Sequence, residues 1–393
     1  MQDVFIVESL RTPFGSFGGA LADISAPQLA AGVIPALLKN TNLSPAAIDE
    51  VIIGQVLAGG AGQAPARQAM RYAALPDSIP ALTINKVCGS GLKSLMLGAA
   101  SIQLGDAEVV IAGGMENMSL APYLLQQGRT GYRMGNGELV DLMIHDGLQD
   151  PYSDKHMGVI AEASAEQNGL TRTEQDEFAL GSYKKAQAAM ENGTFKDELV
   201  AVVKKTRKGE VVVDKDEEPF KVDFARLPEL RAAFKKEGTI TAGNASTISD
   251  GAALTLLASE EAVKKYGLRP KARLVASASN SIHPDLFTEA PVGAIEKVCA
   301  KAGLRLDDID LFEINEAFAA VPLIAIKRLD LDPQKVNVNG GAVAIGHPLG
   351  ASGARLTATL VRELRQRQLR YGLVTLCIGG GEAVAAIIER VEG

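Results

Sequence analysis

Cys88 lies in surroundings that could make it a nucleophile. The stretch NKVCGSGLKS places it after an apparent strand and before a glycine-rich turn that opens a helix. Unpaired backbone N–H groups and the positive end of a helix dipole favour a thiolate at such a position, and glycines leave room for a bulky acyl group. A buried, inert thiol fits the same spacing equally well. Cys88 alone therefore does not decide the chemistry.

Three further residues occupy comparable strand-to-turn positions. His347 lies in GGAVAIGHPLGASGAR, where it could act as a base or be satisfied by the loop backbone. Cys377 precedes IGGGEA at the end of an apolar strand and, taken alone, fits a core thiol. Asn315 follows LFEI and begins NEAFA, where its amide could orient a water or cap the next helix. The remaining cysteine, Cys299, occupies an apolar helical position and is expected to be structural.

The combination points to acyl transfer. A thiol nucleophile beside a base, a second thiol able to pass protons, and backbone donors from glycine turns are the parts that this chemistry needs. A doubled α/β core would bring the four junctions towards one cleft. The residue types do not identify the acyl carrier.

The elements that would position these residues alternate in type. Runs such as VFIVES, EVVIAGG and LVTLCIGG are typical of buried strands, and LKSLMLGAASIQLG and ASGARLTATLVRELRQRQ are typical of helices, which predicts an α/β fold. Residues 42–54 resemble residues 303–315, which indicates two similar halves. Aligning the glycine pairs of EVVIAGG and CIGG places Ile111 opposite Cys377.

An inserted segment separates the two halves. From about residue 120 the sequence becomes polar and helical, and then strongly charged and poor in strands. We expect a domain lying over one end of the core. The predicted division is an N-terminal core half over 1–119, a loop domain over 120–249 and a C-terminal core half over 250–393.

Composition limits the possible partners. The 393 residues carry a net charge of −7 at a pI of about 5.4, which gives no basic field for nucleic acid or an anionic membrane. Three distant cysteines argue against a disulfide framework and against a metal site. No run of 18 apolar residues and no signal-peptide pattern is evident. We expect a cytoplasmic protein that acts on a small molecule.

Five motifs, in order, resemble the signatures of the thiolases. They are NKVCGSGLKS, GGMENMS, NEAFA, GGAVAIGHPLGASGAR and CIGGGEA, and the likeness runs from SLRTPFGSFGGAL almost to the end. The resemblance implies two homologous five-stranded α/β/α domains, layered as αβαβα, with an inserted loop domain that binds coenzyme A. It implies coenzyme A and acetyl-CoA as substrates, no prosthetic group, and a homo-oligomer that is a dimer or, more in keeping with this loop domain, a tetramer.

The resemblance also assigns catalytic roles. His347 would deprotonate Cys88, which takes the acyl group from a thioester. Cys377 would remove a proton from the α-carbon of a second acetyl-CoA, and the carbanion would attack the S-acyl carbon to give acetoacetyl-CoA; thiolysis is the reverse. Asn315, through a water, and His347 would hold the enolate, and the N–H groups of Cys88 and Gly379 the tetrahedral oxyanion.

Substrate-contact positions follow from the same resemblance. DKHMG, with its His-Met pair, resembles the short-chain acetoacetyl-CoA thiolases, and TAGNAS resembles the loop that contacts pantetheine. One basic residue falls near the place where relatives meet the CoA phosphates. The coenzyme A positions implied in this way are Leu148, His156, Met157, Lys221, Leu230, Ala242, Ser246, Ala317 and Phe318.

The sequence departs from the thiolase pattern at one place, and two other classes of protein are alternatives to a thiolase. Many biosynthetic members have MGTGP where this chain has FTEAP, so an aromatic side chain, Phe287, replaces methionine. We expect an altered substrate preference that extends to 2-methyl-branched 3-ketoacyl-CoA. Condensing ketoacyl synthases are disfavoured by NEAFA and Cys377. A thioester-binding protein that has lost catalysis is the non-enzymatic alternative.

Overall fold

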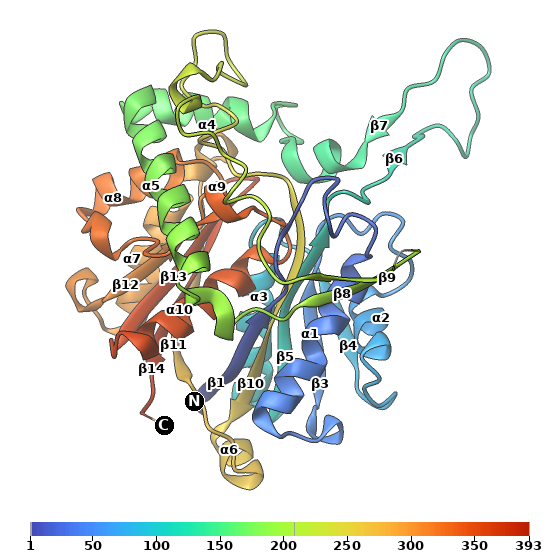
Figure 1. Ribbon diagram of the computed structural model, residues 1–393, viewed down its shortest axis with the longest axis vertical. Helices are drawn as coiled ribbons and strands as arrows, with labels where there is room; N and C mark the ends of the chain where they lie inside the picture. Colours follow the sequence, from blue (N-terminus) through green and yellow to red (C-terminus); the bar gives the residue numbers. More distant parts are fainter. Residues whose placement is uncertain (1, 208, 393) are drawn as a thin grey trace.

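The strands form one large sheet. The computed structural model describes residues 2–207 and 209–392, and a ten-stranded mixed sheet runs through it in the order β12-β13-β14-β11-β1-β10-β5-β3-β4, with β2 paired to β10 (Figure 1). Two short hairpins, β6–β7 and β8–β9, lie outside this sheet. The strands are β1 (Val4–Arg11), β2 (Gly15–Ser16), β3 (Glu50–Gly54), β4 (Ala81–Ile84), β5 (Val109–Asn117), β6 (Tyr123–Leu124), β7 (Val140–Asp141), β8 (Val202–Thr206), β9 (Gly209–Val213), β10 (Ser249–Ser259), β11 (Ala272–Ser281), β12 (Leu311–Ile314), β13 (Tyr371–Ile378) and β14 (Glu382–Arg390).

Helices cover both faces of the sheet. Strands buried on both faces read as nearly continuous apolar runs, as β5 does, and alternate residues of such a strand pack into different cores. Ile111 packs towards α1 and α2, whereas Val110 packs towards α3 and α10. The helices are α1 (Ala26–Thr41), α2 (Pro65–Tyr72), α3 (Ser90–Leu104), α4 (Met157–Gln167), α5 (Arg172–Glu191), α6 (Glu260–Tyr266), α7 (Ala290–Ala302), α8 (Ala320–Leu329), α9 (Ala342–Ile345) and α10 (Ser352–Gln366).

The cores define five layers. One core joins α1 and α2 to the first half of the sheet, a second lies around α3 and α10 between the halves, and a third joins α7 and α8 to the second half. The order helix, sheet, helix, sheet, helix is the expected αβαβα arrangement. The two half-sheets are joined edge to edge by β1 and β11, which pair antiparallel from Val4 opposite Leu274 to Ile6 opposite Ala272.

The pairing of β10 corrects the predicted domain division. This strand lies between β1 and β5, so the N-terminal half has the order β4-β3-β5-β10-β1. The sequence-based boundary near residue 250 assigns most of β10 to the C-terminal half instead. That half contains β12-β13-β14-β11, and its fifth position is a single parallel bridge between Phe312 and Val336.

The internal repeat is real, but its expected register is wrong beyond the first strand. Asp49 accepts the backbone N–H groups of Glu108 and Val109 at 2.8 and 2.9 Å, and Asp310 accepts those of residues 370 and 371 at the same distances. Counting along β5 and β13 from these anchors places Met115, rather than Ile111, opposite Cys377.

Two glycines bring the central helices together at their N-termini. A Cβ on Gly353 would lie 2.4 Å from the backbone nitrogen of Leu92, and one on Gly91 would lie 2.8 Å from the carbonyl oxygen of Gly350. No larger residue fits at either position. The turn before α3 and the loop before α10 therefore lie side by side, and these carry Cys88 and His347.

The inserted segment lies over one end of the core. It contributes α4, α5, the β8–β9 hairpin and an arm around β6 and β7 that projects from the body (Figure 1). The fully buried guanidinium of Arg11, at the end of β1, binds Glu198 at 2.6 Å and Asp216 at 2.7 Å, which ties the segment to the sheet. Within the described ranges no helix has the length and apolar character to span a membrane.

Candidate active site

An apolar cavity of about 260 Å³ collects most of the predicted site residues. Cys88 from the N-terminal half and His347 and Gly379 from the C-terminal half all line it. The walls come from the inserted segment and the C-terminal half. The predicted coenzyme A residues that line it are Leu148, His156, Met157, Ser246, Ala317 and Phe318.

The Cys88 turn is held by its own neighbours. Val87 has a φ of 44°, a left-handed conformation that a β-branched residue rarely adopts. The Asn85 side chain accepts the Val87 N–H at 2.9 Å. The Ser90 hydroxyl accepts the Lys86 N–H at 2.8 Å and donates to the Val87 carbonyl at 2.6 Å. These bonds fix the strained turn that directs Cys88 towards the cavity.

Burial keeps the Cys88 thiol protonated. Desolvation raises the pKa of Cys88 to about 11, and the backbone N–H groups of Gly379 and of Cys88 itself lower it only in part. The helix N-terminus therefore does not keep Cys88 ionised in the resting protein, contrary to the expectation from sequence. The thiol needs a base. The same two N–H groups are directed towards the sulfur, so they can receive the oxyanion of an acyl group bonded to it.

His347 has the hydrogen bonds of a neutral base. Its Nδ1 lies 2.6 Å from the Ser352 hydroxyl, which donates to the Pro348 carbonyl at 2.9 Å, so we assign the ring proton to Nδ1. Nε2 is then left with its lone pair. Burial, with a smaller contribution from Arg355, lowers the pKa of His347 to about 3, so the imidazole is neutral at physiological pH.

Asn315 and Cys377 lie behind the cavity wall, and neither lines it. Asn315 is fully buried, with Nδ2 at 3.4 Å from His347 Nε2 and with no partner for Oδ1 among the described residues. It does not cap α8, whose N-cap is Ala319, so the structural alternative for this residue fails. Burial raises the pKa of Cys377 well above its usual value, and the repulsion from a Cys88 thiolate adds a smaller increase.

An aromatic wall narrows the cavity, and sequence reasoning missed part of it. Phe234 stacks on His156 with ring centres 5.0 Å apart, and it meets Phe318 edge to face at 6.1 Å. Phe287 also meets Phe318 edge to face, at 6.4 Å. Phe234 lies in the polar stretch LRAAFKKEG, which has no periodicity or motif that would have singled it out.

Comparisons with known proteins agree with this geometry. Residues 4–261 match the family described as "Thiolase, N-terminal domain", and residues 268–390 match "Thiolase, C-terminal domain". The chain belongs to the thiolase family. The N-terminal match runs past β10, in agreement with the strand pairing.

Individual thiolases are similar over the whole chain. An acetyl-CoA acetyltransferase of Pseudomonas aeruginosa is 52% identical over 99% of this chain and 100% of its own length. A probable acetyl-CoA acyltransferase of Staphylococcus aureus is 50% identical over the full length of both. The crystal structure of the Bacillus anthracis acetyl-CoA acetyltransferase has a TM-score of 0.97 at 44% identity, covering 100% of this chain and 99% of that one. Human mitochondrial 3-ketoacyl-CoA thiolase has a TM-score of 0.96 at 42% identity, covering 99% of each chain.

A second cavity of this thiolase, about 320 Å³, adjoins the first at Thr247. It holds the other predicted coenzyme A residues: Lys221, Leu230 and Ala242. The Lys221 ammonium is already engaged by the Ser16 hydroxyl and lies 3.6 Å from Glu218. Arg226 also lines this cavity and was not predicted, because a single basic residue in a charged segment carries no distinctive signal.

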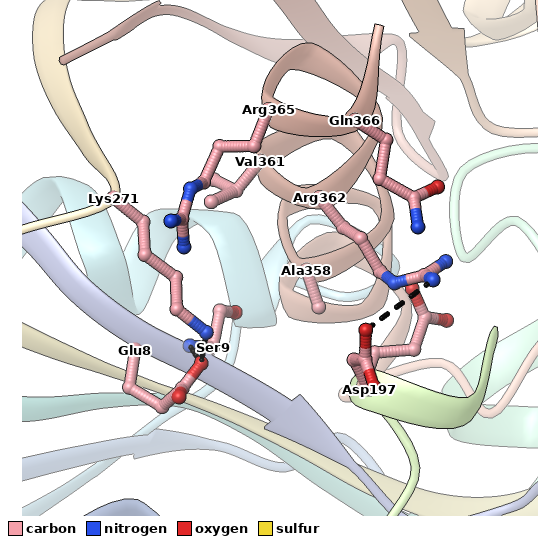
Figure 2. A pocket seen from close by; sticks show the side chains of 10 residues that line it. Glu8, Ser9, Asp197, Lys271, Ala358, Val361, Arg362, Arg365 and Gln366 are labelled. Carbon is pink, nitrogen blue, oxygen red and sulfur yellow. Dashed lines mark hydrogen bonds and ion pairs between the residues drawn. The ribbon is translucent and has the colours of Figure 1, made fainter. Parts of the chain in front are cut away.

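A further cavity of this thiolase lies at the far end of α10 and has a different character. Figure 2 shows walls of both charges: Lys271 pairs with Glu8, and Arg362 lies 3.6 Å from Asp197. No cysteine or histidine lines it. Nowhere in the described ranges do three or more His, Cys, Asp or Glu side chains gather as a set of metal ligands.

Proposed function

We propose that this thiolase is an acetyl-CoA C-acetyltransferase that converts two acetyl-CoA into acetoacetyl-CoA and coenzyme A, reversibly and through an S-acyl-Cys88 intermediate. The observation that carries the proposal is the meeting of a protonated thiol, a neutral imidazole and two convergent N–H donors in one apolar cavity. The name of the Pseudomonas aeruginosa relative supports the same reaction.

The first half-reaction follows from the protonation states. His347 Nε2 takes the proton of Cys88, and the thiolate attacks the thioester carbonyl. The N–H groups of Cys88 and Gly379 receive the negative charge on oxygen. The C–S bond to coenzyme A breaks and the leaving sulfur takes the proton of Cys377. Cys88 keeps the acetyl group, and His347 keeps the Cys88 proton on Nε2.

The second half-reaction uses the buried residues behind the wall. Cys377 takes a proton from the α-carbon of the second acetyl-CoA, and Asn315 together with His347 stabilises the enolate. The carbanion attacks the acetyl carbon on Cys88, and the Cys88–acyl bond breaks to give acetoacetyl-CoA. The Cys88 sulfur takes back the proton held by His347 Nε2. A protonated Cys377 is the starting state for thiolysis, in which it returns a proton to the departing enolate. Condensation needs its thiolate form, which arises when Cys377 gives its proton to the leaving coenzyme A in the first half-reaction.

Coenzyme A would lie across both cavities. The apolar first cavity suits the pantetheine arm, and the second, with Lys221 and Arg226, suits the phosphates. The lining of the first cavity by His156 and Met157 supports short acyl chains. We propose coenzyme A thioesters as substrates rather than any bound prosthetic group.

Two further properties belong to the proposal. An edge strand, β4, exposes Leu82, and the arm exposes Leu125, Met134 and Leu139, which favours a homo-oligomer, with a tetramer expected. Light scattering on the purified protein measures this, and a monomer would contradict it. The three unpaired cysteines favour the reducing cytoplasm.

The direct test is the loss of acetoacetyl-CoA in the presence of purified protein, with and without free coenzyme A. Rapid loss that depends on coenzyme A supports the function, and Cys88→Ala is the control. A folded protein that causes no loss, and that forms no acyl-Cys88 with acetyl-CoA, would instead be a thioester-binding protein.

A second candidate concerns substrate range. Phe287 is 3% exposed and lines the cavity where many biosynthetic members have methionine. This favours activity on 2-methyl-branched 3-ketoacyl-CoA as well. Cleavage of 2-methylacetoacetyl-CoA in the same assay measures it.

A further inference from the structure

Glu116 is a buried carboxylate that binds the loop carrying His347. It is fully buried and accepts three backbone N–H groups: Val56 at 3.0 Å, Leu57 at 3.1 Å and Gly350 at 2.9 Å. Gly350 lies three residues after His347, in the turn that directly follows it. Burial raises the pKa of Glu116 to about 7, and the three N–H groups favour the charged form. The carboxylate therefore fixes the C-terminal side of this loop to the end of β5.

The loop lies directly on β5 at this point. A Cβ on Gly114 would be 1.8 Å from the Gly350 carbonyl oxygen, and one on Gly350 would be 2.6 Å from the carbonyl oxygen of Met115. The backbones are in direct contact, so a shift of Gly350 must move the loop as a unit. Residues 339–352 are buried throughout, which leaves the loop no solvent to relax into.

Glu316 holds the other side of the same loop. It is fully buried and accepts the Val343 N–H at 3.1 Å and the Ser182 hydroxyl at 2.7 Å. The Ser182 oxygen in turn accepts the N–H of Gly341 at 2.9 Å. Between the two carboxylates, the N–H of His347 donates to the Thr247 carbonyl at 3.0 Å.

The equivalent positions in the repeat lack these carboxylates. By the register of the two halves, the counterpart of Glu116 is Ile378, which packs against Gly89, and the counterpart of Glu316 is Gln55. The Gln55 amide donates to the Leu57 carbonyl, and its oxygen has no partner among the described residues. A buried carboxylate is costly unless it is fully bonded. Of the two equivalent openings, as far as the described residues go, the one that carries the base has two such groups and the other has none.

We propose that Glu116 and Glu316 are positioning residues, one from each half, that hold the His347 loop so that Nε2 can take the proton of Cys88. The inference rests on the proposed function of His347 as the base. Neither carboxylate needs to touch the substrate. Loss of either one would leave the cavity intact and misplace the imidazole.

Glu116→Gln tests this with little change in volume. One oxygen of Glu116 serves two N–H groups and the other serves one, so either orientation of the amide sets an NH₂ against a backbone donor. We expect the rate of Cys88 alkylation by iodoacetamide near neutral pH, read by mass spectrometry of the Cys88 peptide, to fall about tenfold to a hundredfold. The kcat for thiolysis should fall likewise, with a smaller change in KM.

The double variant with His347→Ala separates positioning from general destabilisation. If Glu116 acts through His347, adding Glu116→Gln to His347→Ala should slow alkylation no further. The same slowing in both backgrounds would overturn the proposal, as would an unchanged rate in the single variant. Wild-type protein that alkylates normally but does not turn over acetoacetyl-CoA would refute the proposed function alone.

Two further variants guard against a folding defect. Asp310→Asn weakens a carboxylate that also accepts two backbone N–H groups, but at the opposite end of β13, and it should leave alkylation unchanged. Ser182→Ala removes the link between Glu316 and Gly341 and should slow alkylation severalfold. Slowing by Asp310→Asn as large as that by Glu116→Gln would assign the effect to stability.

Discussion

The Cys88 turn and the His347 loop occupy equivalent places in the two halves, before α3 and before α10, yet they are held differently. The Cys88 turn is short and strained, and side chains within a few residues, Asn85 and Ser90, fix it. The His347 loop is longer and is fixed by carboxylates distant in sequence, Glu116 and Glu316. The duplicated scaffold thus provides two similar openings, and different supports make one a nucleophile and the other a base.

Of the variants that test this difference between the two openings, removal of the nucleophile should reduce activity the most. For Cys88→Ala we expect activity to fall on the order of 10⁶-fold, as when a hydrolase loses its nucleophile. No acetyl adduct should form with acetyl-CoA, as read by mass spectrometry. Cys299→Ala is the matched control, because this buried thiol lies in α7 outside the cavity, and it should keep full activity. Retained acylation in Cys88→Ala would move the nucleophile elsewhere.

Cys377→Ala should separate the two half-reactions. The second thiol takes no part in the attack of Cys88 on the thioester, and water can protonate a departing coenzyme A thiolate. Acetylation of Cys88 should therefore persist while turnover falls about 10²- to 10⁴-fold. Mass spectrometry of Cys88 after a quenched reaction with acetyl-CoA measures the first step, and the steady-state rate of thiolysis measures overall turnover. An equal loss of both would show that Cys377 supports the Cys88 turn instead of acting in the second step.

His347→Ala should make activity depend on the intrinsic acidity of Cys88. With its pKa raised to about 11, the unassisted thiol loses its proton only at high pH. Activity near neutral pH should fall about 10²- to 10⁴-fold. The residual rate should then rise about tenfold per pH unit, whereas the wild-type profile is flatter. His145→Ala, at a half-exposed histidine paired with Asp146, is the control. A flat residual profile would count against His347 as the base.

Phe287→Met should have the smallest and most selective effect. Because Phe287 belongs to the C-terminal half and lines only the wall, we expect little change with acetoacetyl-CoA. The ratio of kcat/KM for 2-methylacetoacetyl-CoA to that for acetoacetyl-CoA should fall about tenfold, the range set by a methyl-sized change in an apolar pocket. If neither the wild type nor Phe287→Met cleaves 2-methylacetoacetyl-CoA, Phe287 does not admit a branched substrate.

Local patterns in the sequence predicted the doubled α/β fold and singled out Cys88 and His347, and the resemblance to the thiolases added the five layers and Gly379. Cys88 and Gly379 each lie in a motif that follows a strand, whereas His347 lies between α9 and α10 and not at the expected strand-to-turn junction. The register of the repeat was missed because glycines serve two purposes. Gly113 has a φ of 157° and faces a strand backbone, where a Cβ would be 2.2 Å from the Ala253 carbonyl, whereas Gly380, with a φ of 89°, makes a hairpin turn.

Long-range partners were beyond the sequence. Nothing in SDGAALTLLAS tells which strands β10 joins, since any buried strand in the sheet has the same apolar character. Phe234 reaches the cavity only because the inserted segment folds back over it. Glu116 and Glu316 lie inside quoted motifs, but their partners in the His347 loop become apparent only in three dimensions.

The seam between β1 and β11 has a consequence for how the chain is made. Val4 pairs with Ser259 on one side and with Leu274 on the other, so the first strand to leave the ribosome waits for partners near the last third of the chain. Contacts so distant in sequence form slowly and leave an unpaired strand edge exposed meanwhile. The N-terminal half cannot complete its sheet during synthesis until β10 has emerged. Folding of this thiolase is therefore expected to be largely post-translational, and its nascent chain to depend on protection from aggregation.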